Sequence, residues 1–247
     1  MGETTGIAWT DHTWNPWHGC RKISPGCKNC YMYRDKERYG QEPSVVLRSK
    51  TTFNDPLKWK SGRVFTCSWS DFFIEEADPW RHEAWEIIRQ TPHLTYQILT
   101  KRPERMATHF PADWGHGWAN VWLGISAENQ KYADERLPIL MTAKAAKRFV
   151  SAEPLLEPIY IQDDLMGMTS CGRPDWVIVG GESGPDARLF DPNWAWDLLR
   201  QCRRAETAFF MKQMGSHARS RFPMKHPHGA DPMEWPKEFR VQEFPKD

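Results

Sequence analysis

The chain has 247 residues, a formal net charge of +1, 40% hydrophobic residues and a mean hydropathy of −0.70. This length suits one large domain or two small ones, and the near-neutral charge excludes a global electrostatic field directed at nucleic acid or membrane. No apolar run approaches the roughly 20 residues that span a bilayer, and residues 1–6 lack a signal-peptide pattern, so we expect a cytoplasmic protein without membrane contact.

Three of the six cysteines lie close together near the start of the chain: Cys20, Cys27 and Cys30 fall within eleven residues. In a reducing compartment, clustered cysteines more often bind metal than form disulfides. Thiolates suit iron–sulfur centres, and the Ser-Pro-Gly turn at residues 24–26 can fold Cys20 back toward the other two. Three thiolates would hold three irons of a [4Fe–4S] cluster and leave the fourth iron open to a small molecule.

Short apolar runs then recur along the chain. A first strand is expected within residues 13–17, followed by the cysteine loop and by a helix over residues 31–39 that Gly40 closes. Six further runs of four or five residues predict strands that are buried on both faces of a parallel sheet. They cover residues 63–67, 95–99, 121–125, 148–151, 176–179 and 208–211, so their starts lie 26 to 32 residues apart, about the length of one β-loop-α unit.

Helical patterns fill three of the gaps, over residues 79–89 with Asp78 as a candidate N-cap, over residues 129–141 with Pro138 inside, and over residues 193–202. Repeated βα units with buried strands predict an α/β fold, a partial or complete (β/α) barrel of six to seven parallel strands. A doubly wound open sheet is the alternative. The predicted barrel domain covers residues 1–215.

Residues 216–247 differ from the rest, since they contain five of the 19 prolines and show little periodicity. We expect an extended tail packed on the same domain. Its basic side chains either form a solvated face or contact phosphates. They are Arg219, Arg221, Lys225, His226 and His228.

Polar residues follow the predicted strands repeatedly. One such residue alone is typical of a helix cap or a solvated loop. In parallel α/β folds, however, the carboxyl ends of the strands gather at one edge, where function concentrates. The residues form a predicted ring: Ser68, Ser70, Asp71, Thr100, Lys101, Arg102, Ser126, Glu128, Asn129, Ser151, Glu153, Glu182, Ser183, Lys212 and Gln213. Gly180 and Gly181 begin a turn that is either a plain tight turn or a backbone cradle for a ligand.

Structural zinc is the alternative for the cysteines, with His12 or His18 as the fourth ligand. Spacing alone leaves both metals open, but structural zinc usually belongs to small self-contained modules, so a barrel favours iron and sulfide. The other cysteines are dispersed and typical of ordinary core or surface positions. They are Cys67, Cys171 and Cys202.

The sequence resembles the radical S-adenosylmethionine (radical SAM) enzymes, and more closely the phage-associated three-cysteine branch of that superfamily. The matching stretches are residues 14–20, 24–31, 99–103, 151–155 and 180–184. The resemblance implies that Cys20, Cys27 and Cys30 ligate a [4Fe–4S] cluster whose open iron is chelated by S-adenosylmethionine. Reductive cleavage of that cofactor yields a 5′-deoxyadenosyl radical, which abstracts a hydrogen from the substrate. A flavodoxin-like or ferredoxin-like protein is the expected electron donor.

By position, the resemblance also implies roles for the ring. Ser68, Ser70 or Asp71 would bind the amino group of S-adenosylmethionine, Ser126 and Glu128 its ribose or carboxylate, and Gly180 and Gly181 its adenine. Lys101, Arg102, Glu153, Glu182 and Lys212 would face the substrate.

The phage association suggests a modified thymine base or nucleotide in phage DNA as substrate, isomerised by radical chemistry in the host cytoplasm. Some of the 14 tryptophans would then stack on a flipped base, although core packing is their more ordinary use. Two other functions stay open. One is a zinc-stabilised nucleic-acid-binding or adaptor protein without catalysis, and the other is a barrel that binds a phosphorylated metabolite at residues 180–184.

Overall fold

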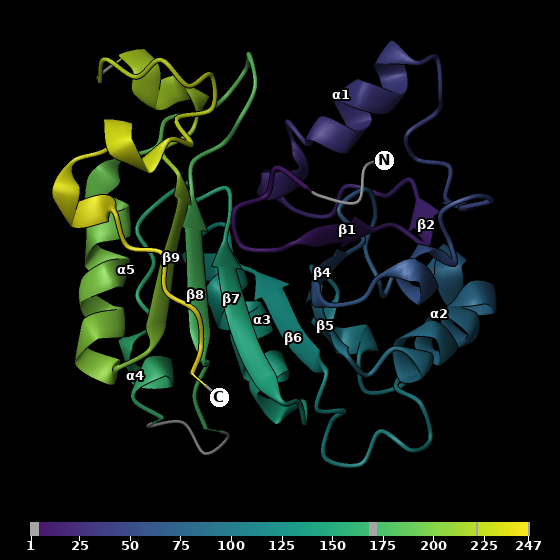
Figure 1. Cartoon of the computed structure of the whole chain (residues 1–247). Helices are drawn as coiled ribbons and strands as arrows, with labels where there is room; N and C mark the ends of the chain where they lie inside the picture. The colour runs from purple at the N-terminus through teal and green to yellow at the C-terminus, as the bar shows by residue number, and fades with distance from the viewer. Residues whose placement is uncertain (1–4, 168–171, 221, 247) are drawn as a thin grey trace. The chain divides into compact units, whose positions relative to one another are not determined.

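The computed structural model describes residues 5–167, 172–220 and 222–246 (Figure 1). Seven parallel strands form a sheet in the order β1-β4-β5-β6-β7-β8-β9, with helices between them and a C-terminal tail. This confirms the predicted α/β fold with a partial barrel of parallel strands. The doubly wound alternative is wrong, because strand order in such a sheet reverses at a switch point and here it follows the chain throughout.

The chain divides into two compact units. Unit 1 comprises Met1–Ile23, Met32–Ile125 and Ala143–Ala146, and unit 2 comprises Ser24–Tyr31, Ser126–Thr142 and Lys147–Asp247. The expected boundary between residues 215 and 216 therefore falls inside unit 2.

Unit 1 carries the first four strands of the sheet. Val64 of β4 pairs with His12 of β1 and Tyr96 of β5, and Tyr96 also lies opposite Val121 of β6. The elements that lie wholly or mostly in this unit are β1 (His12–Trp14), β2 (Trp17–His18), α1 (Tyr31–Arg38), β3 (Leu47–Arg48), β4 (Gly62–Thr66), α2 (Asp78–Gln90), β5 (Leu94–Thr100) and β6 (Val121–Ser126). The short strands β2 and β3 form a separate antiparallel pair.

Asp78 is not the N-cap that its position before Pro79 predicted. It is the first residue of α2, and its carboxylate accepts hydrogen bonds from Arg81 (2.6 Å) and Arg105 (2.7 and 2.8 Å) instead of a backbone N–H. Two guanidinium groups are stronger partners for a carboxylate than an amide, because charge-assisted hydrogen bonds are about twice as strong as neutral ones.

Tryptophans build the core of unit 1. Trp14 and Trp17 are fully buried, and their indole N–H groups donate to the backbone oxygens of Phe53 and Asp71, both at 3.0 Å. Trp85 of α2 packs edge-on against Phe72 at 4.9 Å between ring centroids. The indole N–H groups of Trp14 and Trp17 are thus satisfied within the fold, so the packing interpretation holds for these residues.

Unit 2 carries the last three strands, β7 (Lys147–Ala152), β8 (Trp176–Gly180) and β9 (Ala208–Gln213), and the helices α3 (Gln130–Thr142), α4 (Gln162–Leu165) and α5 (Pro192–Ala205). Every residue of β8 is buried, as its continuous apolar run predicts. The expected start of α5 is also confirmed, since the Asp191 side chain accepts a hydrogen bond from the Asn193 N–H. Pro138 lies inside α3, which continues through it.

The tail contacts unit 2 through β9. Its described residues form 3-10 turns at Ser216–Ser220, Pro232–Glu234 and Lys237–Phe239, and the chain then runs antiparallel to β9 through a bridge between Phe210 and Gln242. The Met211 N–H donates to Val241 O at 2.8 Å, and the Glu243 N–H donates to Phe209 O at 2.9 Å. Within the described ranges, no helix is long and apolar enough to cross a membrane.

Candidate functional site

Asp71 is the centre of a polar network at the carboxyl ends of β4 and β5 in unit 1. Its carboxylate is buried and accepts hydrogen bonds from the Thr100 hydroxyl (2.6 Å) and the backbone N–H groups of Lys101 (2.9 Å) and Phe73 (3.0 Å). Arg102 adds an ion pair at 3.1 Å. Four donors therefore fix this carboxylate, and the topology prediction that the strand-end residues 71 and 100–102 meet is confirmed.

Arg102 links that network to Cys20. Its Nη1 lies 3.9 Å from the Cys20 Sγ, and its Nη2 donates to Arg21 O at 3.0 Å. Burial alone would lower the pKa of Arg102, but Asp71 and Cys20 outweigh it and raise that pKa above its usual range. The guanidinium is therefore a permanent positive charge beside a cysteine.

The serines after β4 hold the segment that leads to Cys20. The Ser70 hydroxyl donates to Gly19 O at 2.6 Å, and the Gly19 N–H donates to Trp69 O at 3.0 Å. The Ser68 hydroxyl accepts from the Asn15 side chain at 3.0 Å. Their predicted contact with the amino group of a cofactor stays a prediction.

Cys67 is a feature of this region that the sequence did not reveal. It is buried at the end of β4 with a positive φ of 66°, a backbone conformation that is uncommon for a residue other than glycine. Burial raises the pKa of its thiol well above the usual range, so it stays protonated. A lone buried thiol fits the predicted structural role, as does the buried Cys202, whereas Cys171 lies outside the described residues.

In unit 2, Glu128 and Arg136 form a fully buried ion pair of 3.0 Å that reaches the cysteine loop. The other carboxylate oxygen of Glu128 accepts a hydrogen bond from the Gly26 N–H at 3.1 Å, and Arg136 also donates to Ser126 O at 2.7 Å. The buried carboxylate thus fixes the turn between the first two cysteines.

Glu182 holds the same loop from the end of β8. Its carboxylate accepts from the Asn29 side chain (3.0 Å) and from Arg188, whose Nε and Nη2 lie at 2.9 and 2.5 Å. Arg188 also donates to Pro25 O at 2.9 Å. Burial alone would raise the pKa of Glu182, but the hydrogen bonds from Arg188 and Asn29 outweigh it and hold that pKa below its usual range.

Glu153 and Lys212 form another ion pair of unit 2, with 3.1 Å between Lys212 Nζ and Glu153 Oε1. The Ser151 hydroxyl donates to the other carboxylate oxygen at 3.3 Å. Gly180 leaves the space for this pair, because a Cβ there would lie 2.5 Å from Glu153 Oε1. Gly181 is closed by backbone, since a Cβ there would lie 2.4 Å from Met214 O.

The three clustered cysteines are all half-buried, and none of them forms a disulfide among the described residues. Cys20 belongs to unit 1, whereas Cys27 and Cys30 belong to unit 2, where the Ser24 hydroxyl lies 3.6 Å from the Cys27 Sγ. Over the part of the chain that the structure describes, no three His, Cys, Asp or Glu side chains form a group that could hold a metal ion. The donors themselves suit iron or zinc, because accessible thiols are their preferred ligands.

The histidines of the zinc alternative have other surroundings. His12 stacks on Trp59 with 4.4 Å between ring centroids, and its Nε2 lies 3.0 Å from Ser61 O. His18 keeps a buried Nδ1 without a hydrogen bond, and burial and Lys36 lower its pKa. A neutral ring with an open nitrogen is compatible with metal ligation, so His18 is the better candidate of the two.

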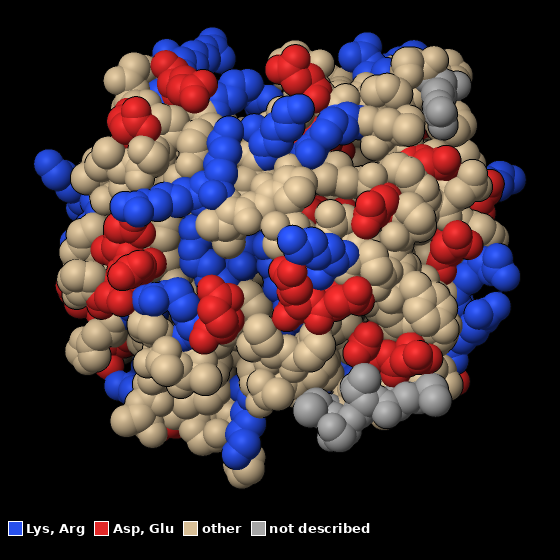
Figure 2. All heavy atoms as spheres, turned by 180° about the vertical axis from the view of Figure 1, so that it is seen from behind, with Lys and Arg blue, Asp and Glu red and all other residues tan. Residues whose placement is uncertain are grey.

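The tail's basic residues are partly used within the fold. The Nδ1 atom of His226 accepts from the backbone N–H groups of His228 (3.2 Å) and Ala230 (3.1 Å), and Glu234 accepts from the backbone N–H groups of Lys225 and His226. Arg221 lies outside the described residues. On the face drawn in Figure 2, cationic and anionic side chains are interspersed, in keeping with the small net charge.

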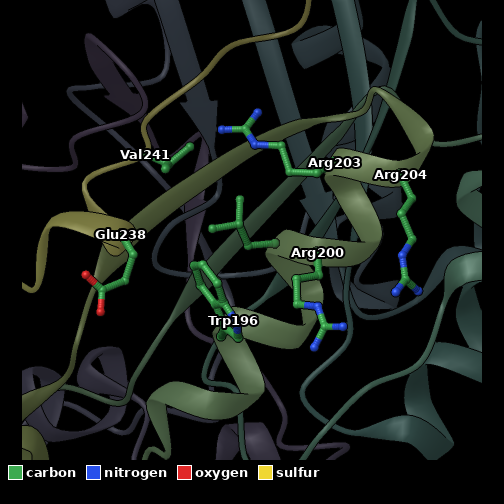
Figure 3. A pocket seen from close by; sticks show the side chains of 7 residues that line it. Trp196, Arg200, Arg203, Arg204, Glu238 and Val241 are labelled. Carbon is green, nitrogen blue, oxygen red and sulfur yellow. The ribbon is translucent and has the colours of Figure 1, made fainter.

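A groove of about 450 Å³ opens in unit 2 between α5 and the tail (Figure 3), and none of the residues that line it belongs to the predicted ring. It is lined by Trp196, Leu199, Arg200, Arg203, Arg204, Glu238 and Val241. Arg203 pairs with Glu243 at 2.7 Å and Arg200 with Asp197 at 3.8 Å, so two of the three arginines already have a carboxylate partner.

The comparisons with known proteins give one match. The model of a family described as "protein of unknown function (DUF5131)" matches residues 4–238, a span that includes every predicted site residue. No curated protein and no solved structure matches the chain.

Proposed function

Because the chain belongs to the DUF5131 family, whose description assigns no function, we propose one from its own residues: a radical SAM enzyme that binds a [4Fe–4S] cluster through Cys20, Cys27 and Cys30. The proposal includes S-adenosylmethionine as the second cofactor.

One observation carries the proposal. In each unit, ion-paired side chains at the carboxyl ends of parallel strands hold the residues that bear the cysteines: Asp71 with Arg102 in unit 1, and Glu182 with Arg188 in unit 2. Buried charges are costly to desolvate, and a surface loop whose thiols have no function would not require them. The use of buried ion pairs to hold a loop that carries three cysteines therefore supports a functional centre.

The bound cofactors would supply one-electron reduction and cleavage of a sulfonium, followed by hydrogen abstraction. The chain's own residues would bind and orient the reactants. The Lys212 ammonium and the Glu153 carboxylate would present a donor and an acceptor to polar groups of the substrate. The side of Gly180 and Gly181 that a Cβ would occupy is filled by Glu153 and Met214, so it offers no space to a flat ring.

The proposed substrate is a modified thymine base or nucleotide, and the proposed reductant is a flavodoxin-like or ferredoxin-like protein of the same reducing compartment. The support for both is the sequence resemblance. Formation of 5′-deoxyadenosine that depends on added DNA or nucleotide would identify the substrate class.

The test is anaerobic reconstitution with iron and sulfide, followed by incubation with S-adenosylmethionine and dithionite. We expect a brown protein with about four irons per chain and formation of 5′-deoxyadenosine. Alanine at Cys20, Cys27 or Cys30 should abolish both, whereas the matched control Cys202→Ala, on the buried face of α5, should keep both. A colourless protein with one tightly bound zinc would overturn the proposal in favour of the zinc alternative.

A further inference from the structure

Arg102 contacts a cysteine, although its position after β5 predicted that it would face a substrate. Its side chain is 10% exposed, and its Nη1 lies 3.9 Å from the Cys20 Sγ and 3.1 Å from Asp71 Oδ2. Its Nη2 donates to Arg21 O. The two terminal nitrogens are thus committed to the Cys20 segment and its carboxylate partner.

The guanidinium is held rigidly in this position. The Thr100 hydroxyl donates to Asp71 at 2.6 Å and accepts from the Arg102 backbone N–H at 2.9 Å. Asp71 also accepts from the backbone N–H groups of Lys101 and Phe73. Backbone, hydroxyl and carboxylate therefore fix where the positive charge lies, and they do so in a buried setting where charges act more strongly than in water.

We propose that Arg102 is the positioning residue of Cys20: its guanidinium orients the sulfur, stabilises negative charge on it, and raises the reduction potential of the cluster that Cys20 ligates. This inference rests on the proposed function, because it concerns the same cluster. N–H donors and positive charge near ligand sulfurs favour the state that holds one more electron. The ion pair with Asp71 fixes the orientation of the guanidinium, so that Nη1 also lies 3.9 Å from the sulfur.

The test is an electron paramagnetic resonance redox titration of the reconstituted holoprotein. Arg102→Met should shift the midpoint potential of the cluster to a more negative value. Arg102→Lys keeps the positive charge but loses the planar pair of N–H donors, so it should shift the potential less in the same direction. The matched control is Arg105→Met, because Arg105 follows the same strand but binds Phe73 O and Asp78. The midpoint potential of the cluster in this variant should equal that of the wild type.

Arg102→Met leaves Asp71 as a buried unpaired charge, so the double variant Asp71→Asn/Arg102→Met serves as a second test that removes both charges. It should show a negative shift smaller than that of Arg102→Met, because the anion is removed together with the cation and only the loss of the guanidinium beside the sulfur remains. An unchanged or more positive potential in both variants, with normal iron content, overturns the role of Arg102 and leaves the proposed function intact. If the wild-type protein binds no cluster, both proposals fall together.

Discussion

The two units hold their parts of the cysteine loop by different means. In unit 1 a buried cation, Arg102, reaches the sulfur of Cys20 itself. In unit 2 buried carboxylates reach the loop through the Gly26 N–H and the Asn29 side chain. The contacts in unit 1 thus reach a thiol, whereas those in unit 2 reach the backbone and an amide side chain, and substitutions in the two units should have different consequences.

The largest effect is expected in unit 2 from Glu128→Gln, which leaves Arg136 buried without its carboxylate. Loss of one partner of a buried pair costs about 3–5 kcal/mol of unfolding free energy. Urea denaturation measures it. The control Asp197→Asn removes an exposed partner of Arg200 on α5 and should cost at most about 1 kcal/mol. Equal losses in the two variants would contradict the structural role of Glu128.

A somewhat smaller loss is expected in unit 1 from Asp71→Asn, about 3 kcal/mol, because the amide still accepts some of the four hydrogen bonds while Arg102 loses its counter-charge. The same denaturation assay checks it. The control is Asp55→Asn, because the Asp55 carboxylate is 27% exposed and pairs with the exposed Lys58. Asp71→Asn should also make Cys20 react faster with iodoacetamide, as peptide mass spectrometry reports, whereas Glu128→Gln should leave Cys20 unaffected. Faster alkylation of Cys20 in Glu128→Gln but not in Asp71→Asn would contradict the assignment of the thiol contact to unit 1.

Gly180 and Gly181 in unit 2 allow the cost of a clash with backbone to be compared with the cost of a clash with a side chain. Gly181→Ala places a Cβ against Met214 O, so the backbone must shift, at a cost of about 1–3 kcal/mol. Gly180→Ala meets side-chain atoms, mainly the carboxylate of Glu153, and should cost less, about 1 kcal/mol or under, while displacing Glu153 from Lys212. Denaturation gives the ranking. A larger loss for Gly180→Ala would show that the Glu153–Lys212 pair itself is essential to the fold.

The smallest effect concerns the pH dependence of unit 2. Because the pKa of Glu182 is lower in the folded protein than its ordinary value of 4.5, its contribution is fully present above that value. It is lost as the pH falls through the folded pKa. Glu182→Gln should therefore be less stable than the wild type near neutrality, with the two curves converging below about pH 4.5. Parallel curves over the whole acidic range would exclude this linkage.

The strands could be predicted because their signal is local. The apolar run at residues 176–179 corresponds to the fully buried β8 within one residue, and Asp191 caps α5 as its place before a proline indicates. Asp78 could not be placed from local sequence alone. Its carboxylate accepts hydrogen bonds from Arg105, which lies 27 residues further along the chain, instead of capping the helix. Such a distant partner leaves no trace in the local pattern.

The candidate site was likewise predictable only where the signal is local or follows from the strand topology. Parallel topology was enough to bring Asp71 and residues 100–102 together, but it did not reveal which base neutralises which acid. Arg136 and Arg188 were both missed, although they follow their partners Glu128 and Glu182 by only eight and six residues. An arginine soon after a strand-end acid is the signal that would have found them. The contact of Arg102 with Cys20, 82 residues apart, has no counterpart in the sequence.

The final stretch of the tail has a consequence for how the protein behaves in concentrated solution. β9 ends the strand order, and residues 241–243 occupy hydrogen-bonding groups of its outer side through Phe209 and Met211. An open strand edge is a template onto which another chain can add. Residues 241–243 thus cover the edge strand β9, and their removal would expose its hydrogen-bonding groups to pairing with other chains and so promote aggregation.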